Sequence, residues 1–319
     1  MLRQNSFLHS FYSSVPIDRN RGTRQDLVFV AVILLPLIIL VGILIYFPAI
    51  DSLITSFTNE NLRIRRLPKF IGLKNYSKLI ENSEFWIVTA RSLLVVCLTL
   101  PLELLISLGL ALLLTEVFPG RAMVRTLVIL PWMLPPIVNG FLWGWLLNGE
   151  YGALNGLLYQ MGIIDEYVTW LRNPDTQIIW VAVVQTWTRF AFPTIILLAG
   201  LQSIPKDLLD AAKVDGASSW QSFKNIVLPL LMPSFAVALT IEFIAAFQIF
   251  DVIWTLTAGG SAGGAINPFT KTLMLYNYEL VFRDLRIGLG AALSYLILFL
   301  SLGVAIVFVT RLYNQAVKS

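Results

Sequence analysis

Charged residues are scarce in this sequence. Lys, Arg, Asp and Glu make up 13% of its 319 residues, whereas a soluble domain usually has about 25%. Hydrophobic residues make up 57%, the mean hydropathy is +0.75, and apolar runs recur along the whole chain. Much of the protein surface must therefore face lipid, and the sequence predicts a single all-α membrane domain without a separate soluble module.

Cysteine and histidine are almost absent. Cys97 is the only cysteine and lies within an apolar run, which excludes an intrachain disulfide framework or a thiolate metal site. His9 is the only histidine, which excludes a histidine metal cluster or a catalytic triad. Convergent His, Asp and Ser groups are scarce, which argues against a membrane-embedded enzyme. We expect no catalytic residue and no metal ligand.

Nucleotide-binding and nucleic-acid-binding signals are also lacking. No Gly-rich loop ends in Gly-Lys-Ser or Gly-Lys-Thr, and the glycines between Gly259 and Gly264 lack the lysine and are expected to form a flexible turn. The net charge is +4, but the basic residues lie in short clusters between apolar runs. We therefore expect no cofactor bound by this chain and no nucleic-acid partner.

Six apolar stretches are long enough to cross a bilayer, which takes about 20 residues per helix. The even number places both termini on one side. Outside the long basic loop between Arg63 and Arg91, the short loops favour cytoplasmic termini. The sequence thus predicts a multi-pass protein of the bacterial cytoplasmic (inner) membrane, with spans at Leu27–Ala49, Ser92–Leu114, Thr126–Leu147, Ile178–Leu201, Val227–Phe250 and Leu289–Val309.

The predicted domain organisation is a cytoplasmic segment, residues 1–26, followed by a transmembrane domain, residues 27–319. The first apolar stretch follows several arginines and is longer than the core of a signal peptide, so we expect a retained helix. The segment before it is either a short interfacial helix or disordered. The interfacial alternative rests on Leu2, Phe7, Leu8, Phe11 and Tyr12.

The loop at residues 203–226 has the signals of a helix–turn–helix. Pro205 suits the first turn of a helix and Asp207 suits its positive end, so we expect a short helix up to about Val214. Gly216 can adopt the left-handed conformation that ends a helix. Ser218 and Gln221 match a capping box, which predicts a second helix leading into the membrane. This pattern has two interpretations, an ordinary helical hairpin or a docking site.

The same loop resembles the EAA loop of binding-protein-dependent ABC importer permeases. Asp210-Ala211-Ala212 is followed after three residues by Gly216, and after nine more by Ile226-Val227-Leu228-Pro229. The family has Glu where this chain has Asp210, which shortens the reach of that carboxylate. Further segments resemble the first permease of maltose-type carbohydrate importers: Phe70–Tyr76 with Phe85-Trp86, Tyr151–Asn155, Leu198–Pro205, and Phe250-Asp251 followed by Leu256–Gly260.

The resemblance implies the type I ABC importer permease fold and a set of partners. These are a second, different permease, two cytoplasmic ATPase subunits that bind ATP and Mg, an extracytoplasmic solute-binding protein, and a sugar substrate. The EAA helix of such permeases sits in a cleft of an ATPase subunit, whose closure rocks the permeases between inward-open and outward-open states. The ATPase-coupling residues implied here are Asp210, Ala211, Ala212, Asp215 and Gly216.

Two charges stand well inside predicted membrane helices, Arg189 in the fourth and Glu242 in the fifth. Charges there are costly, so they should face a cavity or each other. By resemblance, a set of residues around them falls where maltose-type permeases line the central sugar site. That substrate-pathway set is Thr188, Arg189, Phe192, Glu242, Ala245, Ala246 and Ile249. An ion pair that only joins two helices is the alternative, and the two interpretations are compatible.

The substrate's charge stays open. Arg63, Arg65, Arg66 and Lys69, together with Arg189, Arg283 and Arg286, would steer an acidic oligosaccharide or a phosphorylated polyol. Contact with an acidic binding protein or with lipid headgroups is the commoner use of such loops. A secondary transporter remains an alternative class, but it should show related halves, and no internal repeat is evident.

Overall fold

The computed structural model describes residues 24–64, 67–258 and 267–318. The predicted interfacial segment, the glycine-rich turn and Arg65-Arg66 lie outside these ranges. The chain divides into two units, one ending at Ile54 and one beginning at Thr55. The described part is almost entirely helical, with one isolated β-bridge between Thr58 and Phe70.

The described part of the first unit is a continuous apolar helix. It comprises α2 (Arg24–Val41), a π-helical turn (Gly42–Tyr46) and most of α3 (Phe47–Ser56). Residues 29–56 are long and apolar enough to span a membrane, and none of their most apolar window is buried inside the protein. This segment agrees with the first predicted span, and its exposed apolar surface suits a lipid environment.

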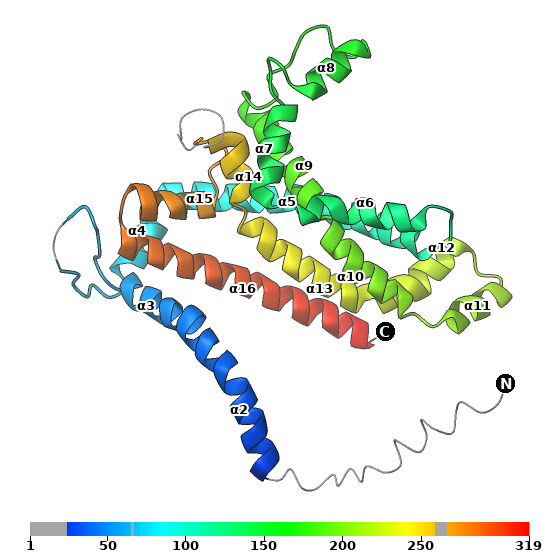
Figure 1. Cartoon of the computed structure of the whole chain (residues 1–319), viewed down its shortest axis with the longest axis horizontal. Helices are drawn as coiled ribbons and strands as arrows, with labels where there is room; N and C mark the ends of the chain where they lie inside the picture. Colours follow the sequence, from blue (N-terminus) through cyan, green and yellow to red (C-terminus); the bar gives the residue numbers. More distant parts are fainter. Residues whose placement is uncertain (1–23, 65–66, 259–266, 319) are drawn as a thin grey trace. The chain divides into compact units, whose positions relative to one another are not determined.

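The second unit holds the remaining helices (Figure 1). They are α4 (Lys74–Glu81), α5 (Ser83–Thr115), α6 (Arg121–Met133), α7 (Pro136–Leu146), α8 (Ala153–Gln160), α9 (Pro174–Arg189), α10 (Ala191–Gln202), α11 (Lys206–Val214), α12 (Ser219–Ser222), α13 (Leu228–Phe247), α14 (Asp251–Ile253), α15 (Leu273–Tyr278) and α16 (Ile287–Lys318). Short π-helical turns follow α12, α14 and α15.

The core forms where α5, α10, α13 and α16 pack together. Helix α13 contacts α5, α10 and α16, and α10 contacts α5; α13 and α16 run side by side in Figure 1. Helices α10 and α13 approach closely at Gly200, where an added Cβ would collide with Ser234 and Leu231. Large buried side chains such as Phe247, Leu197 and Leu293 fill the interior. The close packing fixes where the polar side chains of α5, α9 and α13 meet.

The predicted spans need two corrections. Helices long enough to span are found at Phe29–Ser56, Ser83–Thr115, Ser219–Phe247 and Ile287–Arg311. The third predicted span is broken between α6 and α7 with a bend of 97°, and the fourth between α9 and α10 with a bend of 48°. By length and composition, the described residues hold up to six spans if each bent pair counts as one.

The first break has a clear cause in the sequence. Leu134 precedes Pro135 and adopts an extended conformation (ψ 136°), as a residue before proline prefers. Pro135 is the N-cap of α7 and Pro136 is its first residue, where a missing N–H costs nothing. Pro131 and Pro233 lie inside helices that stay unbroken. Tandem proline thus marks the break here, whereas Pro131 and Pro233 leave their helices unbroken.

Candidate functional site: a membrane ion pair and a surface hairpin

The predicted helix–turn–helix at residues 203–226 is confirmed. Helix α11 starts directly after Pro205 and ends at Val214, and Gly216 has φ +78°. The backbone N–H groups of Gly216 and Ala217 donate to Lys213 O and Ala212 O, which closes the end of the helix. A residue with a Cβ rarely adopts this left-handed conformation, so the turn depends on glycine.

The capping box is confirmed as well. Gln221 N donates to Ser218 Oγ over 3.3 Å, and Ser218 N donates to Gln221 Oε1 over 2.7 Å. These two bonds satisfy backbone donors that the start of α12 leaves without a helical partner. Helix α12 then continues through a π-helical turn into α13, so the hairpin connects directly to a core helix.

The hairpin exposes apolar side chains. Val214 is 87% exposed and Trp220 is 68% exposed. Ala211, Asp215 and Gly216 are exposed, whereas Ala212 is buried. Asp210 is exposed and pairs with Lys213 over 3.0 Å. The predicted coupling residues therefore lie together on one hairpin, at the end of the second unit away from α4 and α15 (Figure 1).

Arg189 and Glu242 form a two-point ion pair. Arg189 Nε and one of its terminal nitrogens donate to the two Glu242 oxygens over 2.9 and 3.2 Å. The Glu242 side chain is fully buried, whereas the Arg189 side chain is 24% exposed. The pair joins the end of α9, where the α9–α10 span bends, to the C-terminal third of α13. The predicted contact between the two charges is thus present.

A third charged side chain, which the sequence analysis missed, lies beside this pair. Glu103 of α5 is fully buried, and among the described residues the charged groups that act on its carboxyl group are Glu242 and Arg189. Neither Glu103 oxygen receives a hydrogen bond from a donor in the described part of the protein. The statement that two charges stand deep in the spans is therefore wrong. The available signal was a Glu between leucines in the middle of the apolar run Ser92–Leu114.

A small polar hollow opens at the exposed side of Arg189. Its volume is about 120 Å³, and of the predicted pathway residues it is lined by Thr188, Arg189, Ala245 and Ile249. The other side chains around it offer hydrogen-bonding groups and an aromatic ring, and sequence reasoning did not single them out as a set. They include Gln185, Gln248, Phe250 and Asp251.

The remaining predicted pathway residues lie outside this lining. Glu242 is buried behind Arg189. Phe192 stacks on Trp132, with ring centroids 5.9 Å apart. Ala246 is buried in the hydrophobic core with Phe243 and Phe247. The structure thus gathers part of the predicted set around one hollow and distributes the rest over the adjacent packing.

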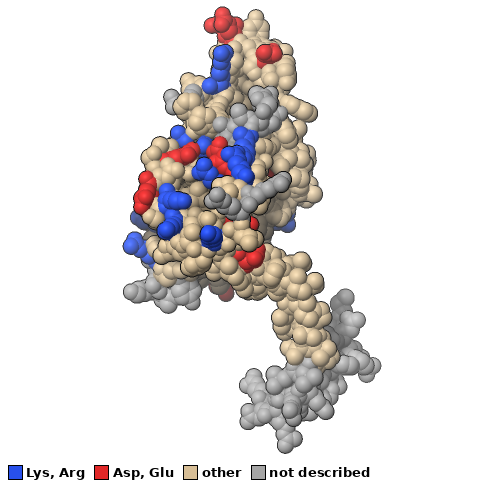
Figure 2. All heavy atoms as spheres, turned by 90° about the vertical axis from the view of Figure 1, so that its left-hand side faces the viewer, with Lys and Arg blue, Asp and Glu red and all other residues tan. Residues whose placement is uncertain are grey.

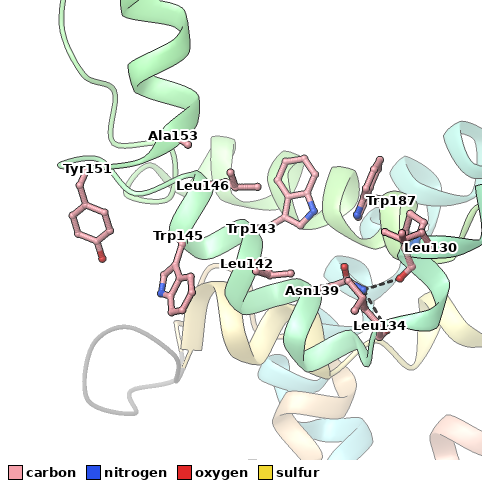
Figure 3. A pocket seen from close by; sticks show the side chains of 11 residues that line it. Leu130, Leu134, Asn139, Leu142, Trp143, Trp145, Leu146, Tyr151, Ala153 and Trp187 are labelled. Carbon is pink, nitrogen blue, oxygen red and sulfur yellow. Dashed lines mark hydrogen bonds between the residues drawn. The ribbon is translucent and has the colours of Figure 1, made fainter. Parts of the chain in front are cut away.

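A larger, mostly apolar hollow of about 820 Å³ lies between α6, α7 and α9. Figure 3 shows the rings of Trp143, Trp145 and Tyr151 along it, with Trp187 of α9 at its far end. The Asn139 side chain is buried and donates to Pro131 O and Leu134 O, which ties α7 to the broken end of α6. The hollow contains none of the predicted pathway residues, although Trp187 and Arg189 share α9.

Several basic groups at the α4–α15 end already have acidic partners. Lys271 contacts Glu84 over 2.5 Å and Glu279 over 2.7 Å. Burial lowers the pKa of Lys271, but hydrogen bonds to the two carboxylates outweigh it and the pKa is raised overall. Arg63 pairs with Asp284 over 3.4 Å. Figure 2 shows basic and acidic side chains interspersed on this face, so it is not a uniformly positive funnel.

Comparisons with known proteins agree with these features. The family described as "Binding-protein-dependent transport system inner membrane component" matches residues 103–319. The chain is 36% identical to the trehalose/maltose transport system permease protein MalF of Thermococcus litoralis, over 86% of this chain and 90% of that protein. It is 33% identical to the sulfoquinovosyl glycerol transport system permease protein SmoG of Agrobacterium fabrum, over 89% of this chain and 90% of that protein.

A solved structure has the same fold. It is the crystal structure of a bacterial ABC transporter involved in the import of the acidic polysaccharide alginate. The TM-score is 0.73 at 25% identity, over 92% of this chain and 96% of the matched chain. The predicted all-α permease fold is therefore confirmed. The chain belongs to the family of binding-protein-dependent transport system inner membrane components and is a multi-pass, non-catalytic permease subunit of a sugar ABC importer.

Proposed function

We propose that this permease passes an oligosaccharide along the hollow at Arg189, and that an ATPase subunit bound to the α11–α12 hairpin drives the movement. The observation that carries the proposal is the partly exposed guanidinium of Arg189, anchored by Glu242 and facing a polar hollow inside a sugar permease. An arginine held in this way keeps donor groups available in a fixed orientation.

The residues around that hollow suit a sugar. Hydroxyl groups need donors and acceptors, which the side chains of Gln185, Gln248 and Asp251 supply. A sugar ring also packs well on an aromatic face, which Phe250 supplies at the same place. The larger hollow with Trp143 and Trp187 offers further aromatic surface for a longer chain.

The hairpin has the properties of a docking element for the ATPase. Val214 and Trp220 expose apolar surface of the kind that a partner would bury. The turn at Gly216 fixes the angle between α11 and α12. Since α12 continues into α13, a movement of the hairpin is passed to the helix that carries Glu242.

The complete importer would contain further subunits. We infer a second permease of the same family, two ATPase subunits that hold ATP and Mg, and an extracytoplasmic binding protein that delivers the sugar. Both termini and the hairpin would then face the cytoplasm. A similar crystal structure contains a bacterial alginate ABC transporter in complex with a periplasmic protein that holds an alginate pentasaccharide. This supports delivery of the sugar by a binding protein.

An acidic saccharide is the second candidate substrate. It is favoured by the exposed guanidinium groups of Arg283 and Arg286 and by the alginate importer's similarity. Against it, Arg189 is already neutralised by Glu242, and Arg63 and Lys271 also have acidic partners. A neutral oligosaccharide, as the name of the trehalose/maltose relative suggests, needs no free positive charge.

We expect a neutral oligosaccharide to compete better than its acidic counterpart, because the cations nearest the pathway are already paired. The test measures uptake of a labelled sugar in the presence of neutral or uronate-containing oligosaccharides of equal length. An Arg283→Gln, Arg286→Gln variant is the control for steering by charge. Strong competition by the acidic saccharide that weakens with salt and in this variant would instead establish an acidic substrate.

A further inference from the structure

Three ionisable side chains lie in the core of the second unit, each from a different helix. Glu103 comes from α5, Arg189 from α9 and Glu242 from α13. Both glutamate side chains are fully buried. Both Glu242 oxygens accept from the single guanidinium. The Glu103 carboxyl group, on which Glu242 and Arg189 act, receives no hydrogen bond from the described residues.

The charges in this cluster do not balance if both carboxyl groups are ionised. One guanidinium neutralises one carboxylate, and a second, fully buried carboxylate would have no cation of its own and no hydrogen-bond donor among the described residues. Such a group takes up a proton instead of remaining charged. Repulsion between two neighbouring carboxylates also favours uptake of a proton by one of them. The proton removes the repulsion and allows a hydrogen bond between the two groups.

In the part of the chain that the structure describes, no other charged group near Glu103 relieves the imbalance. Within the described residues, the charges that act on it are Glu242 and Arg189. Helix α10 also packs on α5 and carries no ionisable side chain. Helices α4 and α15 contact the other end of α5, where Leu273 N donates to Ser92 Oγ.

We propose that Glu103 is a proton-binding site in the membrane core: it holds a proton at neutral pH and donates a hydrogen bond from its carboxylic acid to Glu242. Four residues further along α5, Ser107 Oγ donates to Phe190 O at the bend between α9 and α10. One face of α5 therefore holds both the bend and the ion pair that lies beside it.

The test is infrared spectroscopy of the full chain, purified from membranes together with its bound subunits. A protonated carboxyl group has a C=O stretch distinct from that of a carboxylate. We expect this band in the wild type at pH 7 and its loss in Glu103→Gln. Glu116→Gln, at the exposed end of the same helix, is the matched control and should keep the band.

A second variant and a transport assay complete the test. Glu103→Asp keeps an acid, so its band should move in frequency and persist. Glu103→Gln should keep uptake within about twofold of the wild type from pH 6 to pH 8, since a neutral amide also donates to Glu242. The proposal is overturned if the wild type lacks the protonated band, or if the band is unchanged in both Glu103 variants.

Discussion

Replacing Gly216 with valine is expected to abolish most of the coupling between ATP hydrolysis and uptake while leaving the protein folded. Gly216 has φ +78°, and an added Cβ would meet no atom within 4 Å. The cost therefore comes from the backbone, about 1–2 kcal/mol for a left-handed residue with a side chain. A β-branched residue will shift the turn toward other conformations and turn α11 away from its docking position.

The measurement is substrate-stimulated ATPase activity together with uptake, at equal amounts of protein in the membrane. We expect uptake to fall by roughly tenfold, the factor that corresponds to about 1.4 kcal/mol. Gly216→Asn is the matched control, because asparagine tolerates the left-handed conformation. Gly109, on an exposed face of α5, provides a second valine control away from the hairpin. Normal coupled uptake in Gly216→Val would rule out docking through this turn.

Removing one member of the Arg189–Glu242 pair is the second change with a large expected effect. Arg189→Met leaves Glu242 fully buried and without its cation, which typically costs about 3–5 kcal/mol. Glu242→Met leaves Arg189 without its partner. Because the Arg189 side chain is 24% exposed, the loss of stability should be smaller than in Arg189→Met. Both variants should lower the thermal unfolding midpoint of the purified protein and reduce uptake.

The double variant separates a structural role from a transport role. Two methionines of similar volume remove both buried charges, so stability should recover. Uptake should stay low, because the hollow has lost the guanidinium that faces it. Arg125→Met, an exposed arginine on α6, controls for the loss of a positive charge. Full recovery of uptake in the double variant would show that the pair is purely structural. Normal uptake in both single variants would exclude both the structural role and the transport role.

Local signals predicted the hairpin correctly. Pro205, Gly216 and the Ser218–Gln221 box each act on the backbone within a few residues, so their effect does not depend on the rest of the fold. The structure places helix ends and the left-handed turn where these residues predict them. The same local signals do not predict the coupling role of the hairpin, because that role depends on the surface of a partner protein.

Tertiary features were harder to predict. The sequence suggested that Arg189 and Glu242 could meet, but it did not show that Glu103 lies against them, because contact between α5 and α13 depends on packing across the core. Ala246 shows the same limit: one position after Ala245, which lines the hollow, it points into the core instead. The apolar run at residues 126–147 predicts one continuous span, whereas the structure bends by 97° at the tandem proline before α7.

The central claim is that this chain imports a sugar with energy from an ATPase partner. The most direct measurement uses proteoliposomes that contain the chain and its co-purifying subunits. ATP is enclosed inside, on the side that the cytoplasmic face would take. The binding protein and the labelled sugar are added outside. Accumulation is predicted to require internal ATP and to persist when a protonophore removes the ion gradient. Accumulation driven by an ion gradient without ATP would contradict the account and point to a secondary transporter.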